Sequence, residues 1–162
     1  MWLSRLIAIL LVGMLTACTG LSVTPLGTNF TKDDLRIAVI GTGGRNGQIY
    51  SRALSHLLGD ATDPAFTLSS ELSVASGSTL TVRGSSSNLQ KRSMTASITL
   101  VDAATGKTVM SDSISESSTV GTVSSYYAQT RSDKHSDERT SLLLAERVAA
   151  RVHLYFLDAK GQ

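Results

Sequence analysis

The chain has 162 residues, with 15 Lys and Arg against 13 Asp and Glu, so its formal net charge is +2. A charge this close to zero gives no general argument for nucleic acid or another polyanion as a partner. The single cysteine excludes an internal disulfide and a multi-thiolate metal site. The three histidines, His56, His135 and His153, lie far apart and form no H-x-x-x-H pair, so we expect no metal and no other cofactor.

The first eighteen residues have the pattern of an export signal. Arg5 precedes an uninterrupted apolar run over residues 6–15, and small residues follow before Cys18. The run is about half of the roughly 20 residues that a membrane-spanning helix needs. A secretory leader followed by an incidental cysteine is one interpretation. However, Leu-Thr-Ala-Cys at the end of the run resembles the lipobox of bacterial lipoproteins, in which the leader is removed and the cysteine is acylated.

This pattern predicts the organisation of the chain. We expect a signal peptide over residues 1–17, then a lipid anchor at Cys18 with a polar linker that extends to residue 34. Three acyl chains would hold the protein on a bilayer almost permanently, because each buried CH₂ contributes about 0.8 kcal/mol. Residues 35–162 are then one domain with one core, tethered to a membrane surface outside the cytosol.

The domain begins with a strand, a turn and a helix. Residues 35–40 are rich in β-branched side chains and predict a strand, and residues 41–47 predict a glycine turn. Residues 48–58 have apolar side chains at helical spacing, and Gly59 ends the helix. The glycine turn invites a dinucleotide-binding interpretation, but Asn46 occupies the place of the third glycine in G-x-G-x-x-G. We interpret it as a structural turn, with a small nucleotide-dependent enzyme as the alternative.

From Ala65 onward the apolar period is two, which indicates strands. Residues 66–74 form one strand, and residues 79–83 are either a second short strand or its extension after a bend, before a polar turn at 84–89. Residues 91–102 alternate again, 102–107 predict a tight hairpin loop, and 108–116 predict the returning strand. Many outward positions are Ser or Thr. The inward sets are Phe66, Leu68, Ser70, Leu72 and Val74; Met94, Ala96, Ile98 and Leu100; and either Val109, Ser111 and Ser113 or Met110 and Ile114.

A polar segment and a long helix complete the chain. Residues 117–130 predict either a loop or the frayed start of the last helix, and residues 132–157 predict that helix. Its early acids Asp133, Asp137 and Glu138 suit the helix dipole. The order β, α, several β, α predicts an α+β two-layer sandwich, with a mostly antiparallel four-stranded sheet and two helices packed on one face. The apolar stripe of this helix is Leu142, Ala145, Ala149, Val152 and Phe156, widened by Leu144, Val148 and Tyr155.

Nothing in the sequence has the pattern of a catalytic site. Serines are abundant, but no G-x-S-x-G elbow precedes a helix. The paired acids 33–34 and 137–138 are neighbours in sequence and should point in different directions, unlike a working carboxylate pair. We expect no catalytic residues and a protein that is not an enzyme.

The pieces together resemble a known family. The lipobox, the strand and helix, the Ser/Thr-rich meander with the hairpin at residues 96–109, Ser-Tyr-Tyr-Ala at 125–128 and the helix from Glu138 are similar to the LPS-assembly lipoproteins of the LptE type, especially their α-proteobacterial branch. The resemblance implies an outer-membrane lipoprotein that plugs the lumen of a large β-barrel of the LptD type, helps that barrel to assemble and binds lipopolysaccharide on its way to the outer leaflet.

Lipopolysaccharide carries phosphates, so its ligands would be cations. Arg83, Lys91 and Arg92 bracket one turn and are candidates that converge at one end of the sheet, and Arg45 in the glycine turn is a fourth. For each of them the alternative is a solubilising surface charge. For the whole protein, the alternative is a structural or adaptor envelope lipoprotein of another periplasmic complex.

Overall fold

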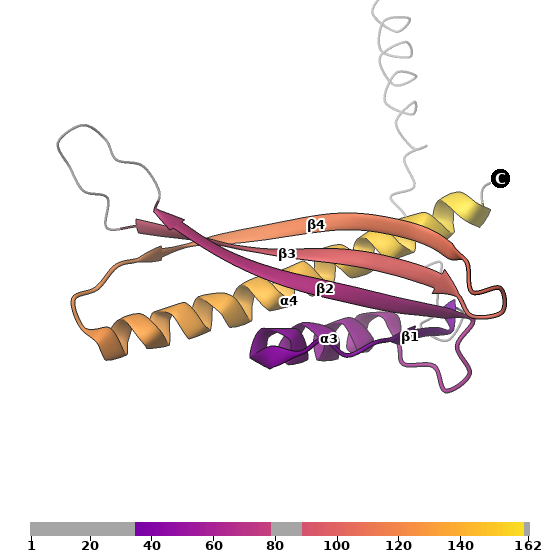
Figure 1. The fold of residues 1–162 in the computed structure, drawn as a ribbon, viewed down its shortest axis with the longest axis horizontal. Coiled ribbons are helices and arrows are strands. Elements are labelled where there is room, and N and C mark those ends of the chain that lie inside the picture. The colour runs from indigo at the N-terminus through magenta and orange to yellow at the C-terminus, as the bar shows by residue number, and fades with distance from the viewer. Residues whose placement is uncertain (1–34, 79–88, 161–162) are drawn as a thin grey trace, which may run out of the picture.

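The computed structural model describes residues 35–78 and 89–160. It has one four-stranded sheet covered on one face by two helices, which confirms the predicted α+β two-layer class (Figure 1). The strands lie in the order β1-β2-β3-β4, with β1 parallel to β2 and the other pairs antiparallel. Along the chain the elements are β1 (Ile37–Val39), α3 (Gly44–Leu58), β2 (Phe66–Ser78), β3 (Leu89–Asp102), β4 (Thr108–Gly121) and α4 (Tyr126–Lys160).

The domain is elongated because its main elements are long and run side by side. Strands β2, β3 and β4 have 13, 14 and 14 residues, and each spans about 45 Å at roughly 3.3 Å per residue. Helix α4 has 35 residues and spans about 50 Å at roughly 1.5 Å per residue. Figure 1 shows α4 crossing the whole sheet, whereas α3 lies beside only its middle part.

The alternation of side chains along the strands places the core between the sheet and the helices. The predicted inward residues of β3, from Met94 to Leu100, are all buried. On β4 the inward set is Met110 and Ile114, which decides between the two faces that the sequence left open. The hairpin between β3 and β4 also follows the prediction, and Gly106 has a φ of 66°, which favours glycine.

Helix α3 begins earlier than predicted. The turn covers only residues 41–43, and Gly44 to Gly47 form the first turn of the helix. Gly47 is buried against the preceding loop, because a Cβ on it would lie 2.6 Å from the carbonyl oxygen of Thr42. Close packing explains this glycine without a nucleotide. Gly59 ends the helix as predicted, with φ 88° and its N–H bonded to the carbonyl of Ser55.

Helix α4 is longer than predicted at both ends, and its buried stripe is shifted. Residues 117–121, predicted as loop or helix start, instead complete β4. Leu142 is 46% exposed, so its assignment to the apolar stripe was wrong. The polar residues Thr140 and Ser141 are buried in the region where that stripe was predicted to begin. The buried apolar residues of α4 are Leu144, Ala145, Val148, Ala149 and Val152.

Several predictions lie outside the described residues. These are the signal peptide, Cys18 and the linker to residue 34, as well as Arg83 and the segment 79–88. Leu89, predicted as the end of a turn, is the first residue of β3. In the described parts of the chain, no helix is both long enough and apolar enough to cross a membrane.

Candidate functional site: the open face of the sheet and the cations of helix α4

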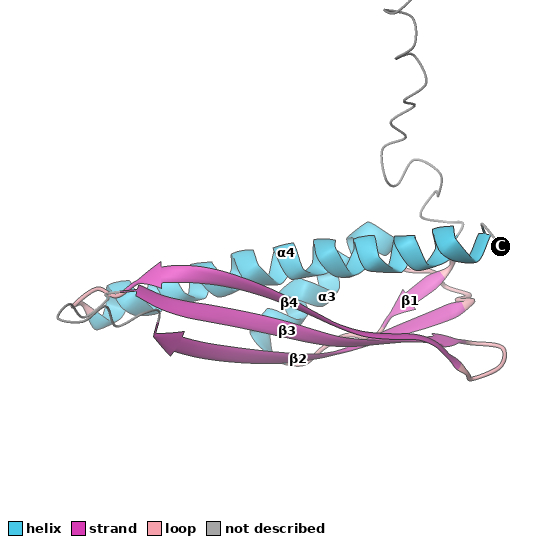
Figure 2. Cartoon of the chain, turned by 90° about the horizontal axis from the view of Figure 1, so that it is seen from above, coloured by secondary structure: helices cyan, strands magenta, loops and turns pink. Residues whose placement is uncertain are grey.

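The face of the sheet that points away from the helices is coated with small hydroxyl residues. Figure 2 shows both helices on the other side of the sheet, and we call this surface, which no described helix covers, the open face. Strand register pairs Ser69 with Thr99 and Ser111 across it, and Ser73 with Thr95 and Ser115. The open face consists of Thr67, Ser69, Glu71, Ser73, Ala75 and Gly77 of β2, Leu89, Lys91, Ser93, Thr95, Ser97, Thr99 and Val101 of β3, and Thr108, Ser111, Ser113, Ser115, Ser117 and Thr119 of β4.

The chemistry of the open face is polar and nearly uncharged. Glu71 and Lys91 are its charged residues, and its larger aliphatic side chains, Leu89 and Val101, lie at opposite ends. The hydroxyls of Thr95 and Ser115 are 2.8 Å apart and join neighbouring strands. Most of the remaining hydroxyls point to the outside, where each can donate and accept hydrogen bonds. This surface is suited to a hydrated polar partner and not to an apolar one.

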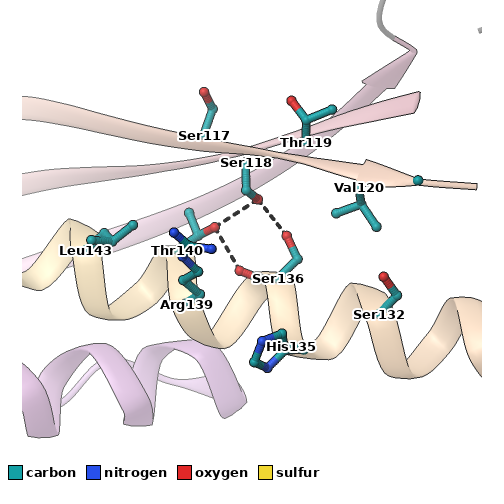
Figure 3. Close-up of a pocket in the computed structure, with 11 residues that line it drawn as sticks. Ser117, Ser118, Thr119, Val120, Ser132, His135, Ser136, Arg139, Thr140 and Leu143 are labelled. Atoms are coloured by element: carbon teal, nitrogen blue, oxygen red, sulfur yellow. Dashed lines mark hydrogen bonds between the residues drawn. The ribbon is translucent and has the colours of Figure 1, made fainter.

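A cluster of three hydroxyl side chains, Ser118, Ser136 and Thr140, lies between β4 and α4 (Figure 3). The hydroxyl oxygens of Ser118 and Ser136 lie 2.6 Å apart, and that of Thr140 lies 3.0 Å from Ser118. Thr140 also donates to the carbonyl of Ser136 at 2.8 Å. They line a hollow of about 410 Å³ that also contacts His135, yet no hydrogen bond in the described part of the chain joins His135 to them. Their evident role is to fix the edge strand to the helix.

Arg92, one of the predicted lipopolysaccharide ligands, is part of the same helix–sheet junction. Its Nε and one terminal nitrogen donate to the two carboxylate oxygens of Asp137 at 2.8 and 2.9 Å, and Asp133 lies 3.8 Å away. The hydrogen bonds that Arg92 donates to Asp137 are the main reason that the pKa of Arg92 is raised above its usual value, although burial opposes the shift. Two carboxylates neutralise this cation, so in this structure it holds α4 to β3 and is not presented to a ligand.

Two other predicted cations, Lys91 and Arg45, lie in the described residues, and neither joins Arg92. Lys91 follows the strand alternation onto the open face, opposite to Arg92, so these two neighbours point to different sides of the sheet. Arg45 lies in the first turn of α3 and forms an ion pair with Glu138 of α4. The convergence predicted for Lys91 and Arg92 is therefore wrong. The hollow that contains Arg45 is also lined by Arg131 and Lys134, which were not among the predicted ligands.

Two further ion pairs connect α4 to the inward acids of the edge strand. Arg151 donates to Asp112 at 2.6 Å and is the main reason that the pKa of Asp112 is lowered. Nε of Arg147 lies 2.7 Å from Oε2 of Glu116, but this oxygen accepts no hydrogen bond among the described residues, so the contact is purely ionic. Arg147 also donates to the carbonyl of Ser115 at 3.4 Å, which occupies part of the backbone edge of β4.

Comparison with known proteins shows the fold. No family model and no curated protein matches the chain. Three bacterial proteins of known structure share its architecture. A protein of Caulobacter crescentus described as a lipoprotein is 21% identical, with a TM-score of 0.61 over 76% of this chain and 93% of its own. Rare lipoprotein B of Shewanella oneidensis is 12% identical, with a TM-score of 0.58 over 76% and 96%. Lipoprotein B of Nitrosomonas europaea is 8% identical, with a TM-score of 0.59 over 75% and 83%.

Proposed function

We propose that this protein is an outer-membrane lipoprotein, acylated on Cys18, that plugs and helps to assemble a β-barrel lipopolysaccharide translocon and binds lipopolysaccharide during its delivery to the outer leaflet. The leader and its terminal cysteine support the anchor. The three similar structures, all described as lipoproteins, support an envelope role. The proposed work is binding, without a catalytic step.

The open face is the observation that carries the plug hypothesis. The interior of an outer-membrane barrel is polar and hydrated, so a domain enclosed there needs surfaces that exchange hydrogen bonds with water and with lumen side chains. A row such as Ser73, Thr95 and Ser115 meets that need across three strands. An apolar open face would instead predict a dry interface between permanent partners.

The dimensions of the domain restrict the barrel that it fits. Four strands at about 4.8 Å spacing, with their side chains, are roughly 20 Å wide, and a helix layer packs about 10 Å from the sheet. A domain of this size does not fit small barrels, in which side chains fill the interior. It requires a barrel of roughly 22 strands or more, the class whose lumens hold plugs. The proposed partner is therefore a very large barrel.

Purification from the native envelope tests the proposal. The full chain should co-purify with one large β-barrel in near-equal amounts. Replacing Ser97 or Ser113 of the open face by Trp should lower the yield of the barrel, because the added ring occupies space that the lumen wall needs. Leu154→Trp is the matched control on α4, where the side chain is 38% exposed on the helix side.

The outcome distinguishes the proposal from its alternative. If the protein is recovered alone from membranes in which the barrel is present, the plug hypothesis is wrong. An adaptor lipoprotein of another periplasmic complex is then the better interpretation. Normal recovery of the barrel with both open-face Trp variants would contradict the assignment of the open face.

A further inference from the structure

Helices α3 and α4 together form a hollow that is lined by cations. Its residues are Arg45 of α3 and Arg131, Lys134, His135 and Glu138 of α4, and its volume is about 400 Å³. Both helices lie on the side of the sheet opposite to the open face (Figure 2). The hollow and the open face are therefore separate surfaces of the domain.

The acids of this part of α4 leave two of these cations uncompensated. Asp137 and Asp133 turn towards Arg92 on the sheet side, and Glu138 pairs with Arg45. Arg131 and Lys134 have no ion pair within residues 35–78 and 89–160. The hollow thus has a net positive charge even with His135 neutral.

Without a bound anion, the positive charges around the hollow are unfavourable to one another. Arg131 and Lys134 are three residues apart on one helix, where like charges repel by a few tenths of a kcal/mol. Arg45 lies in the first turn of α3, where the helix dipole favours anions over cations, and that turn has no acidic residue. An anion in the hollow would compensate these charges.

We propose that this hollow is a binding site for a phosphomonoester group. A phosphomonoester carries a charge of about −1.5 to −2, which matches the two uncompensated cations, and its three oxygens accept several hydrogen bonds. The guanidinium of Arg131 can hold two of these oxygens in a bidentate contact, and the ammonium of Lys134 supplies a mobile point charge. The group belongs either to a phosphorylated lipid headgroup or to free phosphate; the lipid source rests on the proposed function, but the site itself does not.

Titration of the full chain in detergent micelles tests the site. The probes are diphosphoryl lipid A, the same lipid without its phosphates, and inorganic phosphate. Arg131→Gln combined with Lys134→Gln should weaken binding of diphosphoryl lipid A by about tenfold, that is, by about 1.4 kcal/mol. The control combines Arg52→Gln with Lys107→Gln, which removes one Arg and one Lys outside the hollow and should change binding less than about twofold.

A second variant protects the test against misfolding. Glu138→Gln removes the hollow's only carboxylate and frees Arg45, so it should tighten binding by about threefold or more. Equal affinity for lipid A and inorganic phosphate, with the same response to the variants, supports the site and assigns free phosphate as its source. Three results would overturn the proposal: the two double variants weaken binding of diphosphoryl lipid A equally, the lipid without phosphates binds as tightly as diphosphoryl lipid A, or Glu138→Gln does not tighten binding. Normal recovery of the barrel with the Arg131/Lys134 variant would show that the plug function does not depend on this site.

Discussion

The junction between Arg92 and Asp137 gives the sharpest test of how this fold is held together. The change is Arg92→Met, which keeps much of the side-chain volume but removes the charge. The Arg92 and Asp137 side chains are 18% and 17% exposed, and two hydrogen bonds of 2.8 and 2.9 Å join them. Breaking a fully buried pair costs about 3–5 kcal/mol, and an exposed pair is worth about 0.2–1 kcal/mol. We expect the free energy of unfolding to fall by about 2 kcal/mol.

Equilibrium unfolding in urea measures this loss. Arg151→Met is the matched control, since it removes the same group from another ion pair between α4 and the sheet, but one whose side chains are 43% and 34% exposed, and it should cost less than about 1 kcal/mol. Adding Asp137→Leu to Arg92→Met should recover part of the loss, because the largely buried carboxylate of Asp137 is then no longer left without its cation. If Arg92→Met costs no more than Arg151→Met, the reasoning from burial is refuted.

The same variant should have a local effect on α4. The first part of α4 extends past the start of α3, as Figure 1 shows. Arg92 and the hydroxyl cluster around Ser136 therefore hold residues 126–137 to the sheet. Amide hydrogen exchange should therefore speed up selectively over residues 126–137 and remain slow around Val148. Uniform acceleration over the whole helix would contradict this local account.

Three further changes are measured by urea unfolding; two probe close packing, and one probes the protonation of His153. Gly47→Ala should lose about 1–3 kcal/mol, because its Cβ would lie 2.6 Å from the Thr42 carbonyl oxygen, whereas Gly43→Ala meets open space and should be nearly neutral. Leu144→Ala should lose about 2–5 kcal/mol through the cavity that it leaves. Burial lowers the pKa of His153, so the unfolded chain takes up the proton first and stability should fall as the pH drops below about 6.5; His153→Gln should remove that part of the pH dependence, and an unchanged slope would contradict it.

The sequence predicted the elements whose apolar residues carry a clear period. β3 is the best example, since every second residue from Met94 to Leu100 is apolar and all four are buried. The end of β4 had no such signal, because its inward residues Asp112, Glu116 and Ser118 are polar. Each of these inward polar side chains has a polar partner on the distant helix α4, namely Arg151, Arg147 and Ser136 in turn. A local pattern does not contain those partners.

The same physical reason explains the error in α4. The segment 126–141 presents Ser136, Thr140 and Ser141 to the sheet, so its buried side has no apolar stripe to reveal the helix or its phase. The wrong stripe through Leu142 followed from reading only apolar residues.

The candidate site was predicted in part. The Ser/Thr coating of the outward strand positions was evident from alternation alone, and the structure places it on one uncovered face. Alternation also predicts that Lys91 and Arg92 point to opposite sides, which their closeness in sequence obscured. Asp133 and Asp137 are four residues apart and so lie on one face of the helix. This spacing was the sequence signal that a cation packs against that face.

Photocrosslinking in intact cells tests the central claim most directly. A photoreactive side chain placed at Ser97, in the middle of the open face, should form a covalent adduct with one large outer-membrane β-barrel, at a yield that does not change when the hollow between α3 and α4 is altered. Adducts only with water-soluble periplasmic proteins, or none at all from a protein that is correctly folded and lipidated, would contradict the account.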